Sequence, residues 1–257
     1  MAEQNSNQSV QRVFMIIEQM CKEEESSVTA LSKATGLNKT TVFRFLNTLV
    51  DMGYAVKNEK TEMYSLTLKF LRISSRKLAS YDIQRELHPI LQSISSEFGE
   101  TVHLVERNGN RVVYIDKFES DTNSVRMVSR IGMSLNIFTT AVGKAMLAMS
   151  DNSEIKKLWE ELPHKKKTSH TITEFEDFIN EIEVIRNCGF SMDNEENELD
   201  VRCVAVAIPD AYGEYLYAVS VSAPKNRMTD EKVNEISKRL LTLSRGEVSK
   251  LALNGSI

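Results

Sequence analysis

Polar side chains recur along one face of the stretch NKTTVFRFLN, which begins at Asn38. The stretch holds lysine, threonine, arginine and asparagine, with the ring of Phe43 beside them. Lys and Thr at the start of a helix suit contacts with phosphate oxygens, whereas Arg and Asn suit hydrogen bonds to the edges of bases. The pattern predicts a surface that contacts double-stranded DNA. Its residues are Lys39, Thr40, Thr41, Phe43, Arg44 and Asn47.

Three predicted helices must position this surface. Hydrophobic spacing predicts the first helix over residues 10–20 and a short second helix over residues 30–34. Thr29 is the predicted N-cap of the second helix, and Leu31 and Ala34 are predicted to face inward. The apolar face of the first helix is formed by Val10, Val13, Phe14, Ile17 and Met20.

Gly36 stands where the chain must turn sharply before the third helix, and glycine permits such a turn without steric cost. Asn38 is the predicted cap of that helix, which runs to Met52. Its inner face consists of Val42, Phe45, Leu46 and Leu49. The arrangement predicts a helix-turn-helix whose last helix enters the major groove of DNA. The alternative is an ordinary helical hairpin with a solvated polar face.

The segment after the third helix favours DNA binding over the plain hairpin. Gly53 and Tyr54 end the helix, and AVKN, EKTE and MYSL predict a strand, a turn and a strand. This hairpin is the wing of a winged helix, with Lys57 and Lys60 near its tip for contacts with backbone phosphate. Residues 67–80 then predict a helix, either a linker or the first packed helix of a second domain. Its apolar seam is Phe70, Leu71 and Leu78.

The charge of the chain changes sign along its length. All 257 residues together carry a formal net charge of −4. Residues 1–80 hold 11 Lys and Arg against 8 Asp and Glu, a net charge of +3, so residues 81–257 carry −7. A basic end joined to an acidic body predicts two domains with different partners. We therefore expect a DNA-binding domain over residues 1–66, a linker helix over residues 67–80 and a second domain over residues 81–257.

Composition excludes several classes of protein. A content of 41% hydrophobic and 26% charged residues is typical of a globular chain rather than a disordered one. The start MAEQNSNQSV lacks the pattern of a signal peptide, and no apolar run is long enough to span a bilayer. Three widely spaced cysteines fit a reducing compartment better than a disulfide framework or a zinc cluster. We expect a cytoplasmic protein without a metal or cofactor.

The second part of the chain shows strands, then helices, then strands again, which predicts an α+β fold with a mainly antiparallel sheet. A helix is predicted over residues 81–98, and TVHLVER and RVVYIDKF predict a hairpin joined by NGN. SVRMVS predicts a third strand. FSMD, VRCVAVAIPD and YLYAVSVSA predict three more, with a turn at Tyr212 and Gly213. Further helices are predicted over residues 141–149, 155–161, 174–187 and 230–253.

Several segments give the chain a resemblance to a known family over almost its full length. They are GLNKTTVFRFLNTLVDMGY, YSLTLKFL, SRIGMSLNIFTTAVGKAMLA, MDNEENELDVRCVAVAIPD and YAVSVSAP. The sequence resembles the IclR family of bacterial transcriptional regulators, and within it the branch that senses sugar acids such as 2-keto-3-deoxygluconate. The resemblance implies a winged helix-turn-helix, a linker helix and a GAF- or profilin-like domain for effector binding and oligomerisation. Asp200, where members usually have Gly, and Ala207, where they usually have Pro, depart from the family pattern.

The resemblance also implies partners. A small carboxylate effector, a sugar acid, would bind the second domain and control the binding of a homodimer or homotetramer to DNA. A two-fold dimer predicts a pseudo-palindromic operator. The protein would then repress genes of sugar-acid catabolism.

The segment FTTAVGKAMLA has chemistry of its own. Thr139 or Thr140 can cap its helix, which would leave the amides of Ala141, Val142 and Gly143 free. Free amides and the positive end of a helix dipole favour a carboxylate or phosphate, and small side chains let it approach closely. The alternative is an ordinary well-packed helix start, and the family resemblance favours the anion site.

Four further residues match positions that line the effector cavity in similar proteins: Asp193, Cys203, Ser220 and Ser222. The two serines are two residues apart, so they share one face of a strand. A buried hydroxyl without a partner is costly, and a bound hydroxy acid would satisfy both; alternatively, both face water. Only Asp193 of the acidic run DNEENE is expected to reach the cavity. The rest of that run, and the three lysines of residues 165–167, are expected to form solvated loops.

Cys203 and His103 allow two competing functions. One is an enzyme with Cys203 as nucleophile and His103 as base, and the other is a thiol redox sensor. No glycine-framed turn surrounds Cys203, no acid is placed to orient His103, and a cysteine in an apolar strand is most often a small hydrophobe. His103 is expected to be a core or pocket-edge residue. A regulator is therefore favoured over an enzyme.

Overall fold

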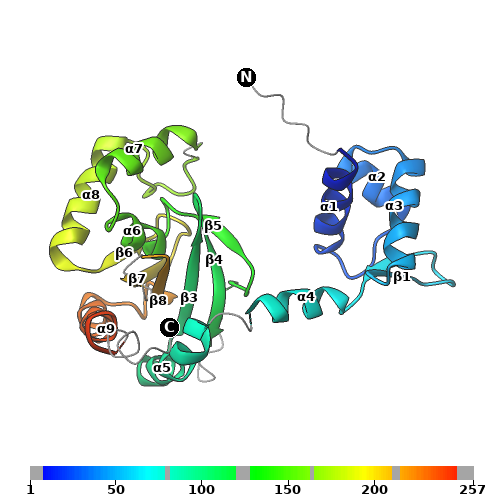
Figure 1. Ribbon diagram of the computed structural model, residues 1–257. Coiled ribbons are helices and arrows are strands. Elements are labelled where there is room, and N and C mark those ends of the chain that lie inside the picture. Colours follow the sequence, from blue (N-terminus) through cyan, green and yellow to red (C-terminus); the bar gives the residue numbers. More distant parts are fainter. Residues whose placement is uncertain (1–7, 79–81, 120–127, 163–164, 210–214, 248–257) are drawn as a thin grey trace. The chain divides into compact units, whose positions relative to one another are not determined.

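The computed structural model describes residues 8–78, 82–119, 128–162, 165–209 and 215–247 (Figure 1). The chain forms two compact units, residues 1–80 and residues 81–257. The boundary falls where the formal charge changes from positive to negative. A separate linker over residues 67–80 stays a prediction. Within the described ranges, no helix is long and apolar enough to cross a membrane.

The first unit is a winged helix-turn-helix, as the sequence predicts. Its elements are α1 (Gln8–Met20), α2 (Val28–Thr35), α3 (Lys39–Asp51), β1 (Ala55–Lys57), β2 (Tyr64–Leu66) and α4 (Lys69–Leu78). The wing strands β1 and β2 pair antiparallel, with Val56 opposite Ser65. The side chains of Val42, Phe45, Leu46 and Leu49 on α3 are buried, as predicted. The rest of this core consists of Ile16, Met20, Leu31, Ala55 and Tyr64.

The inner face of α1 is partly the predicted one: Met20 is buried, and Val13 and Ile17 pack against the core. Ile16 is buried, whereas Val10 and Phe14 are 51% and 56% exposed. Apolar side chains cover so much of the circumference of α1 that spacing alone does not show which of them face the core. The neighbouring helices cover the side that carries Ile16 and Met20, and Val10 and Phe14 remain on the surface.

The caps of α2 and α3 fix the turn between them. Ser27, rather than the predicted Thr29, caps α2: its Oγ accepts a hydrogen bond from the amide of Ala30 at 3.1 Å. The helix begins two residues earlier than predicted. Leu31 is buried as predicted, whereas Ala34 faces solvent. Gly36 adopts the left-handed conformation with φ of 72°, as its place in the turn requires. Asn38 Oδ1 accepts from the amide of Thr41 at 2.8 Å, which confirms the predicted cap of α3.

The second unit is an antiparallel sheet with helices on both sides, which confirms the α+β prediction. Its elements are α5 (Asp82–Phe98), β3 (Thr101–Asn108), β4 (Arg111–Phe118), β5 (Ser134–Asn136), α6 (Ala141–Leu147), α7 (Asn152–Glu161), α8 (Phe175–Cys188), β6 (Ser191–Asn194), β7 (Val201–Ile208), β8 (Tyr217–Pro224), α9 (Asp230–Thr242) and the π-helix η1 (Leu243–Glu247). The strand order is β5-β4-β3-β8-β7-β6. Figure 1 shows α6, α7 and α8 gathered on one side of this sheet, and α5 and α9 on the other.

Within the described residues, the strand that follows the first hairpin is one that the sequence did not predict. Ser134–Asn136 forms β5, whereas Val128 and Ser129, at the end of the predicted strand SVRMVS, belong to no strand. Residues 124–127 of that segment lie outside the described residues. So do the predicted turn at residues 212–213 and the last part of the predicted helix over residues 230–253.

Gly143 allows α6 to pack against the backbone that precedes it. A Cβ atom built on Gly143 would lie 1.9 Å from the carbonyl oxygen of Ile137. No side chain fits at such a distance, so this position requires glycine. The contact holds α6 against the segment after β5, inside a core that includes Phe138, Trp159 and Phe178.

We expect Gly143→Ala to lower the free energy of unfolding by about 3 kcal/mol or more, because the clash is with backbone that cannot rotate away. Gly132→Ala is the matched comparison in the same unit: it meets no atom within 4 Å, and its φ of 84° adds only the cost of a left-handed alanine, about 1–2 kcal/mol. Urea unfolding followed by the fluorescence of Trp159 measures both. Equal losses would contradict the packing argument.

Candidate functional site

The predicted DNA-contacting residues share the outer side of α3. Five of them are exposed: Lys39, Thr40, Phe43, Arg44 and Asn47. Thr41 is half-buried, and its amide donates to the cap at Asn38. The same helix buries its opposite face in the core of the first unit. The helix therefore offers a continuous polar surface on a rigid support.

The wing is less basic than the sequence suggests. Lys57 Nζ lies 2.6 Å from Glu62 Oε2, and this hydrogen bond raises the pKa of Lys57. Lys60 is exposed at the turn, where Asn58 Oδ1 accepts from its backbone amide at 3.0 Å. Of the two predicted phosphate contacts, Lys60 is free to reach DNA, whereas Lys57 already has an anionic partner.

The register of the sheet brings the predicted effector residues into one row. Asp193 on β6 lies directly opposite Cys203 on β7, which lies opposite Ser222 on β8. Ser220 lies opposite His103 on β3. Directly paired residues of an antiparallel sheet point to the same face, and positions two apart do so as well. Five strand residues from four strands thus share the face that α6 covers.

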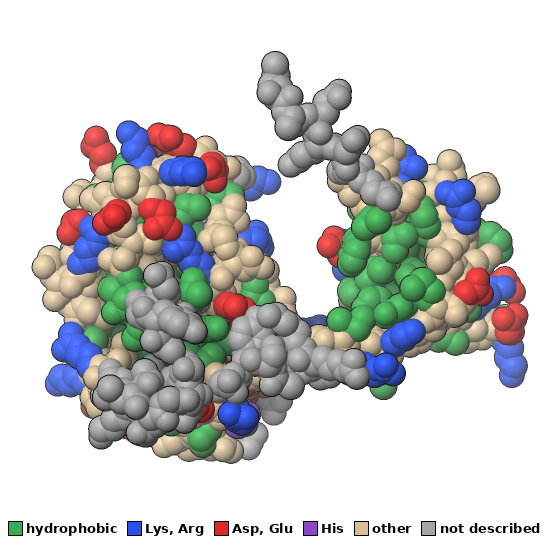
Figure 2. All heavy atoms as spheres, in the orientation of Figure 1, with side chains coloured by type: hydrophobic (Ala, Val, Ile, Leu, Met, Phe, Trp, Pro, Cys, Tyr) green, Lys and Arg blue, Asp and Glu red, His purple; other side chains and the backbone are tan. Residues whose placement is uncertain are grey.

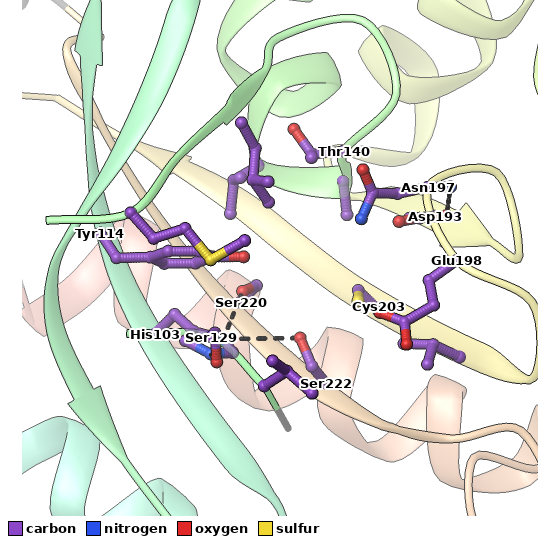
Figure 3. Close-up of a pocket in the computed structure, with 16 residues that line it drawn as sticks. His103, Tyr114, Ser129, Thr140, Asp193, Asn197, Glu198, Cys203, Ser220 and Ser222 are labelled. Atoms are coloured by element: carbon purple, nitrogen blue, oxygen red, sulfur yellow. Dashed lines mark hydrogen bonds between the residues drawn. The ribbon is translucent and has the colours of Figure 1, made fainter. Parts of the chain in front are cut away.

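These side chains line one cavity, of about 610 Å³ of empty space that is partly open to solvent (Figure 3). Predicted residues on its wall are Ala141, Val142, Asp193, Cys203, Ser220 and Ser222. Both serines are buried and face the cavity, so the alternative in which they face water does not hold. The sequence analysis did not single out Tyr114, Ser129, Asn197 and Glu198, which also line it.

The start of α6 differs from the prediction at Gly143. Thr140 caps the helix, and its Oγ1 accepts from the amide of Gly143 at 3.2 Å. That amide is therefore not free, and Gly143 is not among the residues on the cavity wall. The amides of Ala141 and Val142 meet no acceptor in the described part of the chain. Two of the three predicted amides remain available to a ligand.

His103 lies within the cavity wall as a neutral imidazole. Burial lowers its pKa to about 3, and the positive charge of Lys117 adds to the lowering. Its Nε2 lies 2.7 Å from Ser129 Oγ, and its Nδ1 lies 3.5 Å from the hydroxyls of Ser220 and Ser222. A neutral imidazole donates at one nitrogen and accepts at the other, so it orients these hydroxyls without bringing a charge.

The acidic run after β6 is not the solvated loop that its charge predicts. Glu195 and Glu196 are buried: the first pairs with Lys225, and the second lies 2.5 Å from the Nζ of Lys144, which is itself fully buried. The sequence held an indication of this arrangement: Lys144 lies among apolar residues of α6, and a lysine buried there requires an acidic partner.

Asp193 is held at the start of this loop. Its Oδ1 accepts from the amides of Glu196 and Asn197 at 2.8 and 3.2 Å. Burial raises the pKa of Asp193 to about 7, and the neighbouring carboxylate of Glu196 contributes to the rise. Near neutral pH the group therefore exists in both forms, and its protonated form can donate a hydrogen bond into the cavity.

Cys203 lacks the features of a reactive thiol. Burial raises its pKa, and the negative charge of Asp193 raises it further. The thiol is then protonated at neutral pH, whereas nucleophilic and redox-sensing cysteines are thiolates. Among the described residues, no group of His, Cys, Asp and Glu is arranged to hold a metal ion.

Comparisons with known proteins agree with both units. Family models match the helix-turn-helix domain of IclR over residues 9–59 and the C-terminal domain of the bacterial transcriptional regulator IclR over residues 75–248. The chain is 36% identical to the HTH-type transcriptional regulator KdgR of Escherichia coli over 241 residues, which is 94% of this chain and 91% of that protein. It is 34% identical over 225 residues to the DNA-binding transcriptional repressor YiaJ of the same species, covering 86% and 80% of the two chains. The crystal structure of IclR from Thermotoga maritima matches with a TM-score of 0.80 at 31% identity, over 96% of this chain and 100% of that one.

We expect Asp193→Asn to stabilise the protein relative to wild type, and increasingly so as the pH rises. The pKa of Asp193 rises from 3.8 to about 7 on folding, so its contribution to stability is complete below 3.8 and is lost as the pH approaches 7. Asn keeps the acceptor for both amides and carries no charge. The gap in unfolding free energy should widen by on the order of 2 kcal/mol between about pH 5 and about pH 8. Urea unfolding of both proteins at the two pH values measures this difference. An equal difference in unfolding free energy at the two pH values would show that the pKa of Asp193 is not raised by folding.

Proposed function

Because the chain belongs to the IclR family of bacterial transcriptional regulators, we propose that it represses genes of sugar-acid catabolism under the control of a small carboxylate effector. The observation that carries this proposal is the convergence of Asp193, Ser220 and Ser222 on one cavity beside the free amides of Ala141 and Val142. The cavity offers several hydroxyl-binding groups beside apolar side chains such as Met133, Leu135 and Val201. This mixture suits a polyhydroxy acid, which presents hydroxyl groups along a carbon chain. The relative YiaJ, a repressor by name, supports the sign of regulation.

The outer side of α3 is the proposed reader of DNA. Arg44 and Asn47 are proposed to contact base edges in the major groove, and Lys39, Thr40 and Lys60 to contact phosphates. One winged helix covers few base pairs, so the proposal requires two copies of the chain on a pseudo-palindromic operator.

An apolar surface on the first unit supports a homodimer (Figure 2). Val10, Phe14 and Met15 of α1 are 51%, 56% and 44% exposed and lie close together in the sequence. A cluster of exposed apolar side chains is costly in water and is typical of a surface that another protein covers. A second copy of this chain is the occupant that a two-fold operator requires.

The effector is proposed to bind with its carboxylate at the amides of Ala141 and Val142. Its hydroxyl groups would then meet Asp193, Ser220 and Ser222, with Cys203 as an apolar contact beside them. Protonated Asp193 can donate to the ligand, and ionised Asp193 can accept from its hydroxyls. Binding changes the affinity for DNA only if the two conformations of the protein bind the effector differently. Residues 67–80, which join the wing to the second unit along the chain, are the proposed connection.

Arg44→Ala should weaken binding to the operator far more than binding to random DNA. A base-edge contact is typically worth about 1–3 kcal/mol of discrimination. Lys60→Ala is the control, because a lost phosphate contact weakens binding to both DNAs alike. Fluorescence anisotropy with operator and scrambled duplexes measures the ratio. An unchanged ratio in Arg44→Ala would remove α3 from the role of recognition helix.

Asp193→Ala should weaken the response to the effector by about 1–3 kcal/mol, because a buried polar partner is lost, and should leave operator binding intact. Ser220→Ala should have the same effect more mildly. The experiment titrates 2-keto-3-deoxygluconate and gluconate into a preformed complex of protein and operator. Equal half-effect concentrations for wild type and Asp193→Ala would remove Asp193 from the site. A wild-type complex that responds to no sugar acid would overturn the proposed ligand class.

A further inference from the structure

A second recess opens beside the effector cavity, on the other side of Leu135 and Asn197. It encloses about 830 Å³ of empty space, part of it open to solvent. Its wall comes from segments far apart in the sequence: Arg111 at the start of β4, Thr139 before α6, and Lys165 and Lys167 before α8. Leu135 lines both the recess and the effector cavity, so the two are neighbours.

The recess gathers positive charge without a matching acid. Arg111, Lys165 and Lys167 line it, and none of its described lining residues is Asp or Glu. Arg111 is held in place, because its Nε and Nη2 donate to the hydroxyl and carbonyl of Ser134 at 2.7 and 2.8 Å. The orientation of the guanidinium group is therefore fixed. Within the described residues, its Nη1 meets no hydrogen-bond acceptor.

Lys167 is exposed, like Lys165 and Arg111, which agrees with the solvated loop expected for residues 165–167 and leaves all three cations accessible to an anion. Partial burial of its side chain nevertheless lowers the pKa of Lys167. The charge of Asp193, on the wall of the effector cavity, acts against this lowering more strongly than the charge of Arg111 adds to it. Within the recess, Lys167 has only the carboxamide oxygen of Asn197 as an acceptor for its ammonium group. The carboxamide oxygen of Asn197 accepts from only one of the three N–H donors of Lys167, so an anion between Lys167 and Arg111 would be attracted by both cations.

Asn197 connects the recess to the effector cavity. Its side chain lines the cavity (Figure 3), while its Oδ1 accepts from Lys167 and, at 3.4 Å, from the hydroxyl of Thr139. Thr139 and Lys167 both line the recess. An anion that draws these two donors away would release the carboxamide of Asn197, which could then turn to a ligand in the cavity.

We propose that the recess binds a compact oxyanion, a phosphate or carboxylate group, between Arg111, Lys165 and Lys167, with the hydroxyl of Thr139 as a further donor. The oxyanion has two possible sources. It is either a free anion such as inorganic phosphate, or a second anionic group of the effector that reaches past Asn197. The second source rests on the proposed function, whereas the first does not.

The test uses the double variant Lys165→Met/Lys167→Met of the full-length protein. Lys166→Met is the matched control, because Lys166 is exposed between the two and is not on the recess wall. The probes are inorganic phosphate, gluconate with one anionic group, and 6-phosphogluconate with two, each followed by isothermal titration calorimetry. The double variant should weaken binding of the phosphate-bearing probe by about tenfold or more, while Lys166→Met binds like wild type. Gluconate should bind the double variant at least as tightly as wild type, because loss of Lys167 removes one of the two donors that engage the carboxamide of Asn197.

The three probes separate the sources of the anion. Lysine-dependent binding of inorganic phosphate assigns the recess to a free anion, and this result would stand even if no sugar acid bound. Lysine-dependent preference for 6-phosphogluconate over gluconate, without binding of inorganic phosphate, assigns the recess to the effector. The proposal is overturned if neither phosphate-bearing probe binds wild type, or if the double variant and Lys166→Met bind them equally. Gluconate binding that depends on Asp193 alone would then leave the proposed function standing.

Discussion

A fully buried lysine decides how the effector cavity is built. Lys144 has no exposed surface, and its Nζ lies 2.5 Å from Glu196 and 3.1 Å from Glu181. Removal of one partner from a buried ion pair typically costs about 3–5 kcal/mol, because the other charge is left uncompensated. Glu196 must therefore turn inward against α6. The loop after β6 follows it, and this brings Asn197 and Glu198 onto the cavity wall.

The inward turn of Glu196 is accompanied by unusual backbone conformations in the same loop. Glu195 and Asp200 adopt φ values of 66° and 61°, in the left-handed region that most residues avoid. Glu195 Oε2 accepts from the amide of Asp200 at 3.0 Å, and its other carboxylate oxygen pairs with Lys225. These contacts hold the two ends of the loop together. The φ of Asp200 accounts for its departure from the glycine that the family resemblance implies, since aspartate tolerates the left-handed conformation.

The parts of the structure that follow from local pattern could be predicted from sequence. The inner face of α3 and the cap at Asn38 depend on residues three or four positions apart, and the shared face of Ser220 and Ser222 depends on strand alternation. The exposed Phe14 could not be predicted, because α1 is apolar on several sides. The inward turn of Glu196 could not either, since its partner is 52 positions away in the chain. Nothing in the structure explains alanine at position 207.

The ion pair between Lys57 and Glu62 on the wing affects how the affinity for DNA would depend on salt concentration. A phosphate that contacts Lys57 replaces Glu62 as its partner, so little new charge is neutralised there and few counterions are released from the DNA. Glu59 lies beside Lys60 and further reduces the positive potential of the wing. On the proposed mode of DNA binding, the steepness of binding with salt would depend on the cations of α3 and on Lys60 rather than on the total number of lysines and arginines in the first unit. On the same proposal, hydrogen bonds to base edges would supply a correspondingly larger share of the affinity, and these depend less on salt than contacts with backbone phosphate do.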